Sequence, residues 1–197
     1  TIWVKALPKL AALAGSLGSA LTQMVGNLTF DKDSFNLLDD ETKKQLQENF
    51  KVLKDKMDIL SIIIDEDSKA FDGVMLAFQM PKNTENEKKA RIEAIQEGYK
   101  HALEVPLKCA KECLEVLRLQ LLFASYGNKN AITDVGVGAL LAYSGLEGAL
   151  LNVRINLLSI KDVDYKSKIN NEMNTIFEEG NKIREEVLKI VYERLSK

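Results

Sequence analysis

The segment Leu10–Phe30 reads LAALAGSLGSALTQMVGNLTF and contains no ionisable side chain. Its apolar residues recur at spacings of three and four, which is the period of a helix. Small residues at Ala11, Gly15, Gly18 and Thr22 share one track of that helix. A track of small side chains lets two helix axes approach closely. We therefore expect a central helix over about residues 9–27.

A second helix with the same character is predicted from Thr133 or Asp134 to Ile160. Its small residues, Gly138, Ala142, Gly145 and Ala149, again share one track. Both helices are nearly uncharged on all sides, so one chain would not bury them completely. This pattern predicts a two-fold homodimer that completes their burial.

The uncharged first segment follows Lys5 and Lys9, an arrangement that also occurs in signal peptides and membrane spans. Three glycines and several serine, threonine and amide side chains make it less apolar than membrane insertion requires. A buried helix of a cytoplasmic protein without a membrane contact is the favoured interpretation. The chain begins at Thr1 rather than Met, so the natural start of the protein is expected to lie outside it.

Further helices are predicted on both sides of the proline residues. Asp39 or Asp40 is expected to cap a helix whose apolar stripe extends towards Gln79, where Pro81 stops it. The stripe comprises Leu46, Phe50, Leu53, Met57, Leu60 and Ile64. Thr84 and Glu87 have the spacing of a capping box, which starts a helix to about Glu104.

Pro106 is expected in the first turn of the next helix, which runs to Tyr126 and ends at Gly127 as a left-handed C-cap. Asp162 or Asp164 is expected to start the last helix. Its apolar face comprises Ile169, Met173, Ile176, Ile183, Val187, Ile190 and Val191.

Short connections between long helices predict an all-α fold, a single-domain bundle of antiparallel helices over residues 1–197. The net charge of −2 and the scattered basic residues give no electrostatic basis for nucleic-acid binding. No Walker loop, dinucleotide-binding glycine pattern or nucleophile elbow occurs.

No metal site is expected. The chain has one histidine, His101, and two cysteines, Cys109 and Cys113, four positions apart on a predicted helix. Helix geometry does not favour a disulfide at that spacing, and a zinc or di-metal site has too few ligands. We interpret both cysteines as buried small apolar residues.

Three polar features could form a catalytic or binding site, and each also has a purely structural interpretation. Asp67 has an aromatic residue at the fourth position after it, which suits an acid or base, yet it also fits an exposed acid among neighbouring acids. The segment 127–134 offers asparagine amides at the ends of two apolar helices, although many such loops are only caps and turns. Asn152 and Asn156 lie four apart on an apolar helix, where they either bind ligand or tie helices together.

Taken in order, several segments resemble the formiminotetrahydrofolate cyclodeaminase and methenyltetrahydrofolate cyclohydrolase family over essentially the whole chain. They are Ala11-Ala12-Leu13-Ala14-Gly15-Ser16-Leu17-Gly18-Ser19-Ala20-Leu21, Asp67-Ser68-Lys69-Ala70-Phe71, Met80-Pro81-Lys82, Val105-Pro106-Leu107, Gly127-Asn128 with Asn130 and Thr133-Asp134, and Asn152-Val153-Arg154-Ile155-Asn156-Leu157. Each piece alone is weak, but the ordered set is specific.

The resemblance implies a cyclodeaminase-like helical homodimer that binds a reduced folate near the subunit interface as substrate and uses no cofactor. Carried onto matching positions, it nominates Asp67 and Asp134 as acid–base residues. It nominates as substrate contacts Phe71, Lys82, Gly127, Asn128, Asn130, Asn152 and Asn156.

One departure concerns the start of the first helix. The family usually carries Pro-Gly-Gly-Gly-Ser there, whereas this chain has Ala6-Leu7-Pro8-Lys9. A glycine-rich turn lets backbone N–H groups approach a ligand, and bulky side chains prevent that. Either part of the site is lost or the first ten residues are not native, and we favour the second explanation.

The family reactions share one carbon centre between N5 and N10 and need proton transfer and positioning rather than a metal. A stand-alone chain favours the cyclohydrolase, which opens 5,10-methenyltetrahydrofolate to 10-formyltetrahydrofolate. The alternatives are the cyclodeaminase, a non-enzymatic helical dimer of the same fold, and a membrane-associated helical protein.

Overall fold

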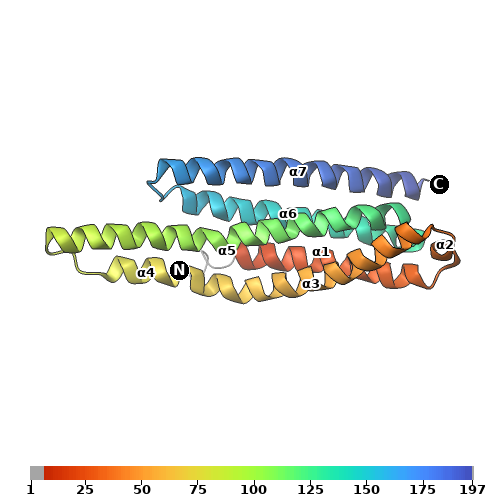
Figure 1. Ribbon diagram of the computed structural model, residues 1–197, viewed down its shortest axis with the longest axis horizontal. Helices are drawn as coiled ribbons and strands as arrows, with labels where there is room; N and C mark the ends of the chain where they lie inside the picture. The colour runs from red at the N-terminus through yellow and green to blue at the C-terminus, as the bar shows by residue number, and fades with distance from the viewer. Residues whose placement is uncertain (1–6, 197) are drawn as a thin grey trace.

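The computed structural model describes residues 7–196, and within that range the side chains of residues 7–8 and 66–70 lie outside the description. The described chain is helical throughout and contains no strand, which confirms the all-α prediction (Figure 1). The elements are α1 (Leu7–Phe30), α2 (Asp33–Asn36), α3 (Asp40–Ala70), α4 (Asp72–Gln79), α5 (Glu85–Tyr126), the 3₁₀ turn η2 (Lys129–Ala131), α6 (Ile132–Leu157) and α7 (Val163–Leu195). The long helices form an elongated bundle, and α5 extends well past the ends of α6 and α7.

Helices α1 and α6 pack closely against each other along the two predicted tracks of small residues. A methyl group added at Gly18 would lie 2.6 Å from the carbonyl oxygen of Gly138, and one added at Gly145 would lie 2.6 Å from that of Ala11. Any side chain at these glycines would therefore collide with backbone. The prediction that both uncharged helices are central is confirmed, and the structure shows in addition that they pack against each other.

A buried polar group joins this crossing to α5. The Gln120 side chain is fully buried and its Nε2 donates to the carbonyl of Gly18 at 3.2 Å and to Oγ1 of Thr22 at 2.9 Å. The Thr22 hydroxyl donates in turn to the Gly18 carbonyl at 3.0 Å. Buried polar atoms need such partners, so the contact fixes how α5 sits on α1.

The predicted helix starts are confirmed at three places by side-chain capping. Asp39 accepts a hydrogen bond from the backbone N–H of Thr42 at 2.9 Å, and Asp162 accepts one from that of Tyr165 at 3.0 Å. The Thr84 hydroxyl accepts from the Glu87 N–H, while the Glu87 carboxylate accepts from the Thr84 N–H, which completes the capping box. The capping bonds lower the pKa of Asp162 and Glu87, and the pKa of Asp39 is lowered first by a hydrogen bond from the Thr42 hydroxyl and then by the bond from the Thr42 N–H.

Two boundary predictions around α5 are wrong. Pro106 does not start a helix but lies inside α5, which is continuous for 42 residues. The missing proline N–H leaves one helical hydrogen bond unmade, but Leu103 and Leu107 on either side are buried, so packing holds the helix together. Gly127 has φ −63° and ψ 165°, which is extended rather than left-handed. Glycine is required at this position because a Cβ atom would lie 2.5 Å from the Phe123 carbonyl oxygen.

Other helix boundaries also differ from the predicted ones. The helix expected to reach Gln79 breaks at Phe71 into α3 and α4, and the polar connection before α3 contains the short helix α2. Helix α6 begins at Ile132, earlier than predicted, so Asp134 lies in its first turn instead of capping it.

Ten large apolar side chains of α1, α6 and the C-cap residue of α6 remain exposed and form what we name the α1/α6 ridge. Their exposed fractions range from 42% at Met24 to 74% at Leu158. The members are Leu10, Leu13, Leu17, Met24, Leu28, Val137, Leu140, Leu151, Ile155 and Leu158. An apolar surface of this extent on a folded chain marks an interaction site.

The described chain has one helix that is long and apolar enough to cross a membrane by length and composition, Lys129–Leu157. Inside the structure, 56% of its apolar window is buried. A core helix of a soluble protein passes the same test.

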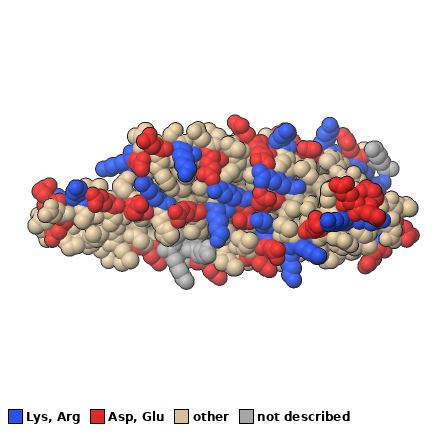
Figure 2. Space-filling model, viewed as in Figure 1, with Lys and Arg blue, Asp and Glu red and all other residues tan. Residues whose placement is uncertain are grey.

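The face that carries α5 shows a different surface. Basic and acidic side chains are interspersed over its middle, and acidic side chains gather towards the right-hand end (Figure 2). Several of them pair between helices: Lys56 of α3 with Glu112 of α5 at 2.7 Å, and Arg118 of α5 with Glu179 of α7 at 2.6 Å. Cys109 and Cys113 are both free and buried beneath this face, as predicted. The hydrogen bond with Cys109 and, after it, burial raise the pKa of the Cys113 thiol.

Candidate active site

The turn between α5 and α6 carries three of the predicted site residues. Asn128 holds this turn together: its Oδ1 accepts from the Asn130 N–H at 3.0 Å and its Nδ2 donates to the Leu28 carbonyl at 2.8 Å. The Asn128 N–H donates to the hydroxyl of Thr29 at 2.8 Å. The Asn128 amide is therefore engaged in shaping the turn, and a contact of this amide with substrate stays a prediction.

The other side of the turn is fixed by the last turn of α7. Arg194 is half-buried, and its guanidinium donates to the carbonyls of Ala124 and Gly127 at 2.6 Å each. Burial lowers its pKa. The turn is thus held between the end of α1 and the end of α7. Nothing in the sequence singles out Arg194, because a lone cation near a helix C-terminus is ordinary.

Asp134 and Asn130 are free to act on a ligand at this end of the bundle. Asp134 is half-buried in the first turn of α6, and Asn130 is exposed on η2. Among the described residues, neither side chain has a hydrogen-bond or ion-pair partner. A carboxylate and an amide without internal partners are suited to proton transfer and to hydrogen bonding of a polar ring.

Asn152 and Asn156 lie on the same helix and are half-buried. Asn156 Nδ2 donates to the Asn152 carbonyl at 3.1 Å and lies 3.5 Å from the Asn152 Oδ1. Both contacts stay within α6, so in the described chain the pair does not tie α6 to another helix. Binding of a ligand by Asn152 and Asn156 stays a prediction.

These two groups of residues do not meet within one chain. Asp134 and Asn152 are 18 positions apart on α6, which places them ~27 Å apart along the helix axis. They project from the same flank of α6, because 18 residues make five complete turns. One chain therefore carries the two groups of predicted site residues at opposite ends of one helix, and we name these groups the two half-sites of the predicted site.

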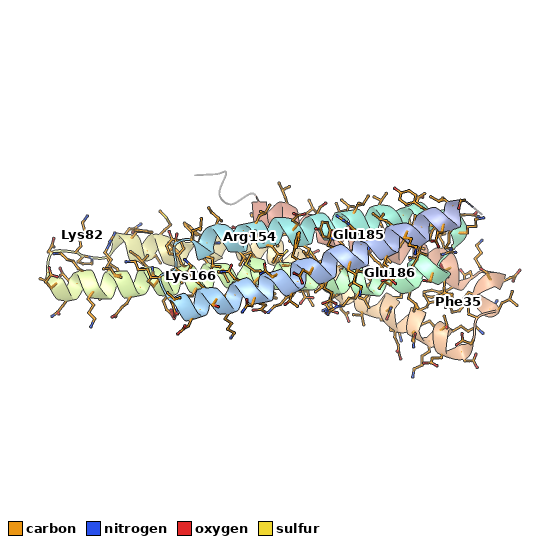
Figure 3. All side chains as sticks on the ribbon, turned by 90° about the horizontal axis from the view of Figure 1, so that it is seen from above. Phe35, Lys82, Arg154, Lys166, Glu185 and Glu186 are labelled. Carbon is orange, nitrogen blue, oxygen red and sulfur yellow. The ribbon has the colours of Figure 1, made fainter. Side chains whose placement is uncertain are left out.

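The remaining predicted residues lie towards the other end of the bundle. Asp67 is in the last turns of α3, and its side chain lies outside the description. Phe71 is half-buried and packs edge-on against Tyr99 at a centroid distance of 6.2 Å. Lys82 is exposed in the connection between α4 and α5, at the far tip of the molecule (Figure 3). Among the described residues no cluster of three His, Cys, Asp or Glu side chains that could hold a metal ion occurs.

Known proteins match this chain over nearly its whole length. The model of the family formiminotransferase-cyclodeaminase matches residues 9–192. The chain belongs to the formiminotransferase-cyclodeaminase family. The resemblance on the quoted segments is thereby confirmed.

Two relatives show the range of the family. A methenyltetrahydrofolate cyclohydrolase from Methylorubrum extorquens is 36% identical over 186 residues, which cover 94% of this chain and 88% of the relative. A formimidoyltransferase-cyclodeaminase from Gallus gallus is 34% identical over 184 residues, which cover 93% of this chain but only 33% of that protein. The chain thus spans about a third of the bifunctional members of the family.

The cyclodeaminase-like fold is also confirmed. The crystal structure of a formiminotetrahydrofolate cyclodeaminase from Thermotoga maritima superposes with a TM-score of 0.81, covering 95% of this chain and 87% of that one at 21% identity. The departure at the start of α1 falls partly outside the description: Ala6 is not described, and Leu7, Pro8 and Lys9 form the first turn of α1.

Proposed function

We propose that this chain is a methenyltetrahydrofolate cyclohydrolase, which adds water to 5,10-methenyltetrahydrofolate and yields 10-formyltetrahydrofolate. The observation that carries the proposal is the match to the relative of that name, which extends over 94% of this chain and 88% of the relative. The bifunctional relatives match over only a third of their length.

The reaction needs a base and an acid near one carbon atom. A water molecule loses a proton as its oxygen bonds to the methenyl carbon, which gives a tetrahedral carbon between N5 and N10. The bond from this carbon to N5 then breaks as N5 takes up a proton. Loss of the hydroxyl proton leaves the formyl group on N10, so one proton is released overall. Placed proton donors and acceptors contribute about 10²–10⁴-fold to such steps.

Asp134 is the residue proposed to move these protons. Its carboxylate is half-buried and has no partner among the described residues. Asn130 on the adjacent turn supplies an amide for the pteridine edge. On the basis of the family resemblance, Asp67 remains a proposed acid–base residue, and Phe71 and Lys82 remain proposed substrate contacts.

The proposed active molecule is a homodimer that pairs through the α1/α6 ridge. A two-fold axis at right angles to α6, at about the level of Tyr143, makes the two α6 helices antiparallel. Asn152 of the partner subunit then comes to the level of Asp134, and Asn156 of the partner subunit to that of Asn130, because both pairs share the same midpoint. This arrangement covers the exposed apolar side chains and joins the two half-sites.

The second candidate function is the cyclodeaminase, in which N10 of 5-formiminotetrahydrofolate attacks the formimino carbon and ammonia leaves. The observation in its favour is that the superposing crystal structure is named as a formiminotetrahydrofolate cyclodeaminase. The same carboxylate and amide would act on the same carbon centre. The two activities are therefore distinguished by substrate.

The test follows the absorbance of the methenyl group with each folate separately. The cyclohydrolase consumes 5,10-methenyltetrahydrofolate, whereas the cyclodeaminase forms it from the formimino compound. We expect consumption by the wild-type protein and a loss of about 10²–10⁴-fold in kcat for Asp134→Asn. The matched control is Asp164→Asn, which changes an exposed carboxylate in the first turn of α7.

Two outcomes of these measurements would contradict the proposal. A folded Asp134→Asn protein with full turnover removes this residue from the mechanism. A wild-type protein that neither turns over nor binds either folate supports the non-enzymatic dimer instead.

A further inference from the structure

The connection between α6 and α7 is held by α5, which runs alongside it (Figure 1). This connection, which we name the α6–α7 loop, extends from the C-cap residue Leu158 to the N-cap residue Asp162. Nε2 of Gln96 donates to the Ser159 carbonyl at 3.0 Å, and Oε1 of Gln96 accepts from the Lys161 N–H at 2.7 Å. One side-chain amide of α5 therefore engages the loop backbone with both its donor and its acceptor.

A second contact lies one helical turn further along α5. Lys100 and Gln96 are four positions apart, so they share one face of the helix. The Lys100 ammonium donates to the Asp162 carboxylate at 3.0 Å and lies 5.2 Å from the centre of the Tyr165 ring. The hydrogen bond to Asp162 raises the pKa of Lys100. The loop and the start of α7 are thus both fastened to the same face of α5.

Of these two residues, Gln96 holds the loop backbone itself. The side chains of Lys100 and Asp162 are 28% and 43% exposed, and a solvated ion pair contributes little to stability. Gln96 is half-buried, and the two backbone groups that it bonds flank Ile160, whose side chain is buried. Removal of the amide would leave a donor and an acceptor beside the core without this partner, which costs more than breaking a surface pair.

The α6–α7 loop continues directly from the half-site of Asn152 and Asn156. The Ser159 N–H donates to the Asn156 carbonyl at 3.1 Å. The last turn of a helix frays readily, because its final carbonyls lack partners within the helix. Gln96 therefore stabilises the end of α6 only three positions after Asn156.

We propose that Gln96 is a positioning residue for the reaction: it holds the last turn of α6, and with it the Asn156 amide, in the orientation that meets the substrate. The proposal rests on the folate function proposed above, in which Asn152 and Asn156 contact the substrate. Gln96 does not touch the substrate in this role and acts through the loop. No local pattern marks Gln96, because its two partners lie 63 and 65 positions away.

The first test compares Gln96→Leu with wild-type protein in steady-state kinetics with 5,10-methenyltetrahydrofolate. Leucine has a similar size but makes neither hydrogen bond, so we expect kcat/KM to fall about 10–100-fold. The matched control is Gln47→Leu on α3, which changes an exposed glutamine that makes no side-chain hydrogen bond among the described residues. The control should retain wild-type kcat/KM.

The variant Gln96→Glu separates positioning from a general loss of stability. A glutamate still accepts from the Lys161 N–H, but its ionised form cannot donate to the Ser159 carbonyl. When the pH is lowered, the carboxyl group takes up a proton and can donate again. We expect the kcat/KM of Gln96→Glu, relative to wild type at each pH, to rise as the pH falls from 8 to 6, whereas the ratio for Gln96→Leu stays constant.

The second test is hydrogen–deuterium exchange, which needs no turnover. We expect the amides of residues 157–161 to exchange about five- to tenfold faster in Gln96→Leu than in wild type or in Gln47→Leu. Unchanged exchange would refute the role of Gln96 in holding the loop. An active wild type with unchanged kcat/KM in a folded Gln96→Leu protein would refute the positioning role alone, whereas a wild type that turns over neither folate would refute the proposed function.

Discussion

At the scale of single residues, Arg194 has the clearest link between structure and the proposed chemistry. It bridges the carbonyls of Ala124 and Gly127, directly before the turn that carries Asn128 and Asn130. We expect Arg194→Met to lower kcat about tenfold with little change in KM, because the turn loses its support from α7. Arg194→Lys should recover part of the loss, since a lysine keeps the charge but cannot bridge both carbonyls.

The measurement is steady-state kinetics well below the melting temperature, with the melting temperature recorded for each variant. The control is Lys189→Met, an exposed cation on the same helix. A fall in melting temperature without any change in kcat would show that Arg194 only stabilises the fold.

At the scale of elements, the crossing of α1 and α6 depends on the absence of side chains. Gly18→Ala would place a methyl group 2.6 Å from the Gly138 carbonyl oxygen and 3.0 Å from the Ala142 nitrogen. Both are backbone atoms, so the helices must separate. We expect the free energy of unfolding to fall by about 1–3 kcal/mol, measured by urea titration.

The matched control for this crossing is Gly73→Ala in α4, where an added methyl group meets nothing within 4 Å. Because alanine has the higher helix propensity, this variant should be as stable as the wild type or up to about 1 kcal/mol more stable. A Gly18→Ala protein with wild-type stability would mean that the close approach of the two helices is wrong.

Local sequence signals were sufficient to predict features that depend on residues close together in the sequence. The capping bonds of Asp39, Thr84 and Asp162 involve residues within four positions, and all three were predictable. The tracks of glycine and alanine predicted two central helices, because small residues let helix axes approach closely, but they did not show that α1 and α6 pack against each other. The prediction that Pro106 lies in the first turn of a helix is wrong, because the packing of its buried neighbours outweighs this local preference of proline.

The candidate site was predictable in composition but not in arrangement. The sequence pointed to Asn128, Asn130, Asp134, Asn152 and Asn156, yet spacing alone did not reveal that Asn128 is used to shape its own turn. Arg194 and Gln120 make contacts with residues 67 or more positions away, and no local pattern encodes such contacts.

At the scale of the whole molecule, the proposed dimer brings each predicted half-site on α6 together with the other half-site of the partner subunit. We expect wild-type protein to sediment as a dimer. Purified heterodimers of one Asp134→Asn chain and one Asn152→Ala chain should have about half of wild-type activity, because one of the two shared sites is then intact. Each parent homodimer should have only background activity.

The heterodimer is prepared by co-expression with two different affinity tags, and sedimentation velocity checks its assembly. Heterodimers that form but are no more active than either parent would refute a site shared between Asp134 and Asn152 of the partner subunit. A wild-type monomer with full activity would refute the dimer itself.

The pairing of α1 with α6 also has a consequence for biosynthesis. The uncharged helix α1 is synthesised well before α6, which covers its glycine track and ends at Leu157. At 5–20 residues per second, α1 waits about 6–25 s for that cover. During this interval the nascent chain exposes the apolar, uncharged surface of α1. We therefore expect the yield of folded protein to depend on chaperones that bind nascent chains.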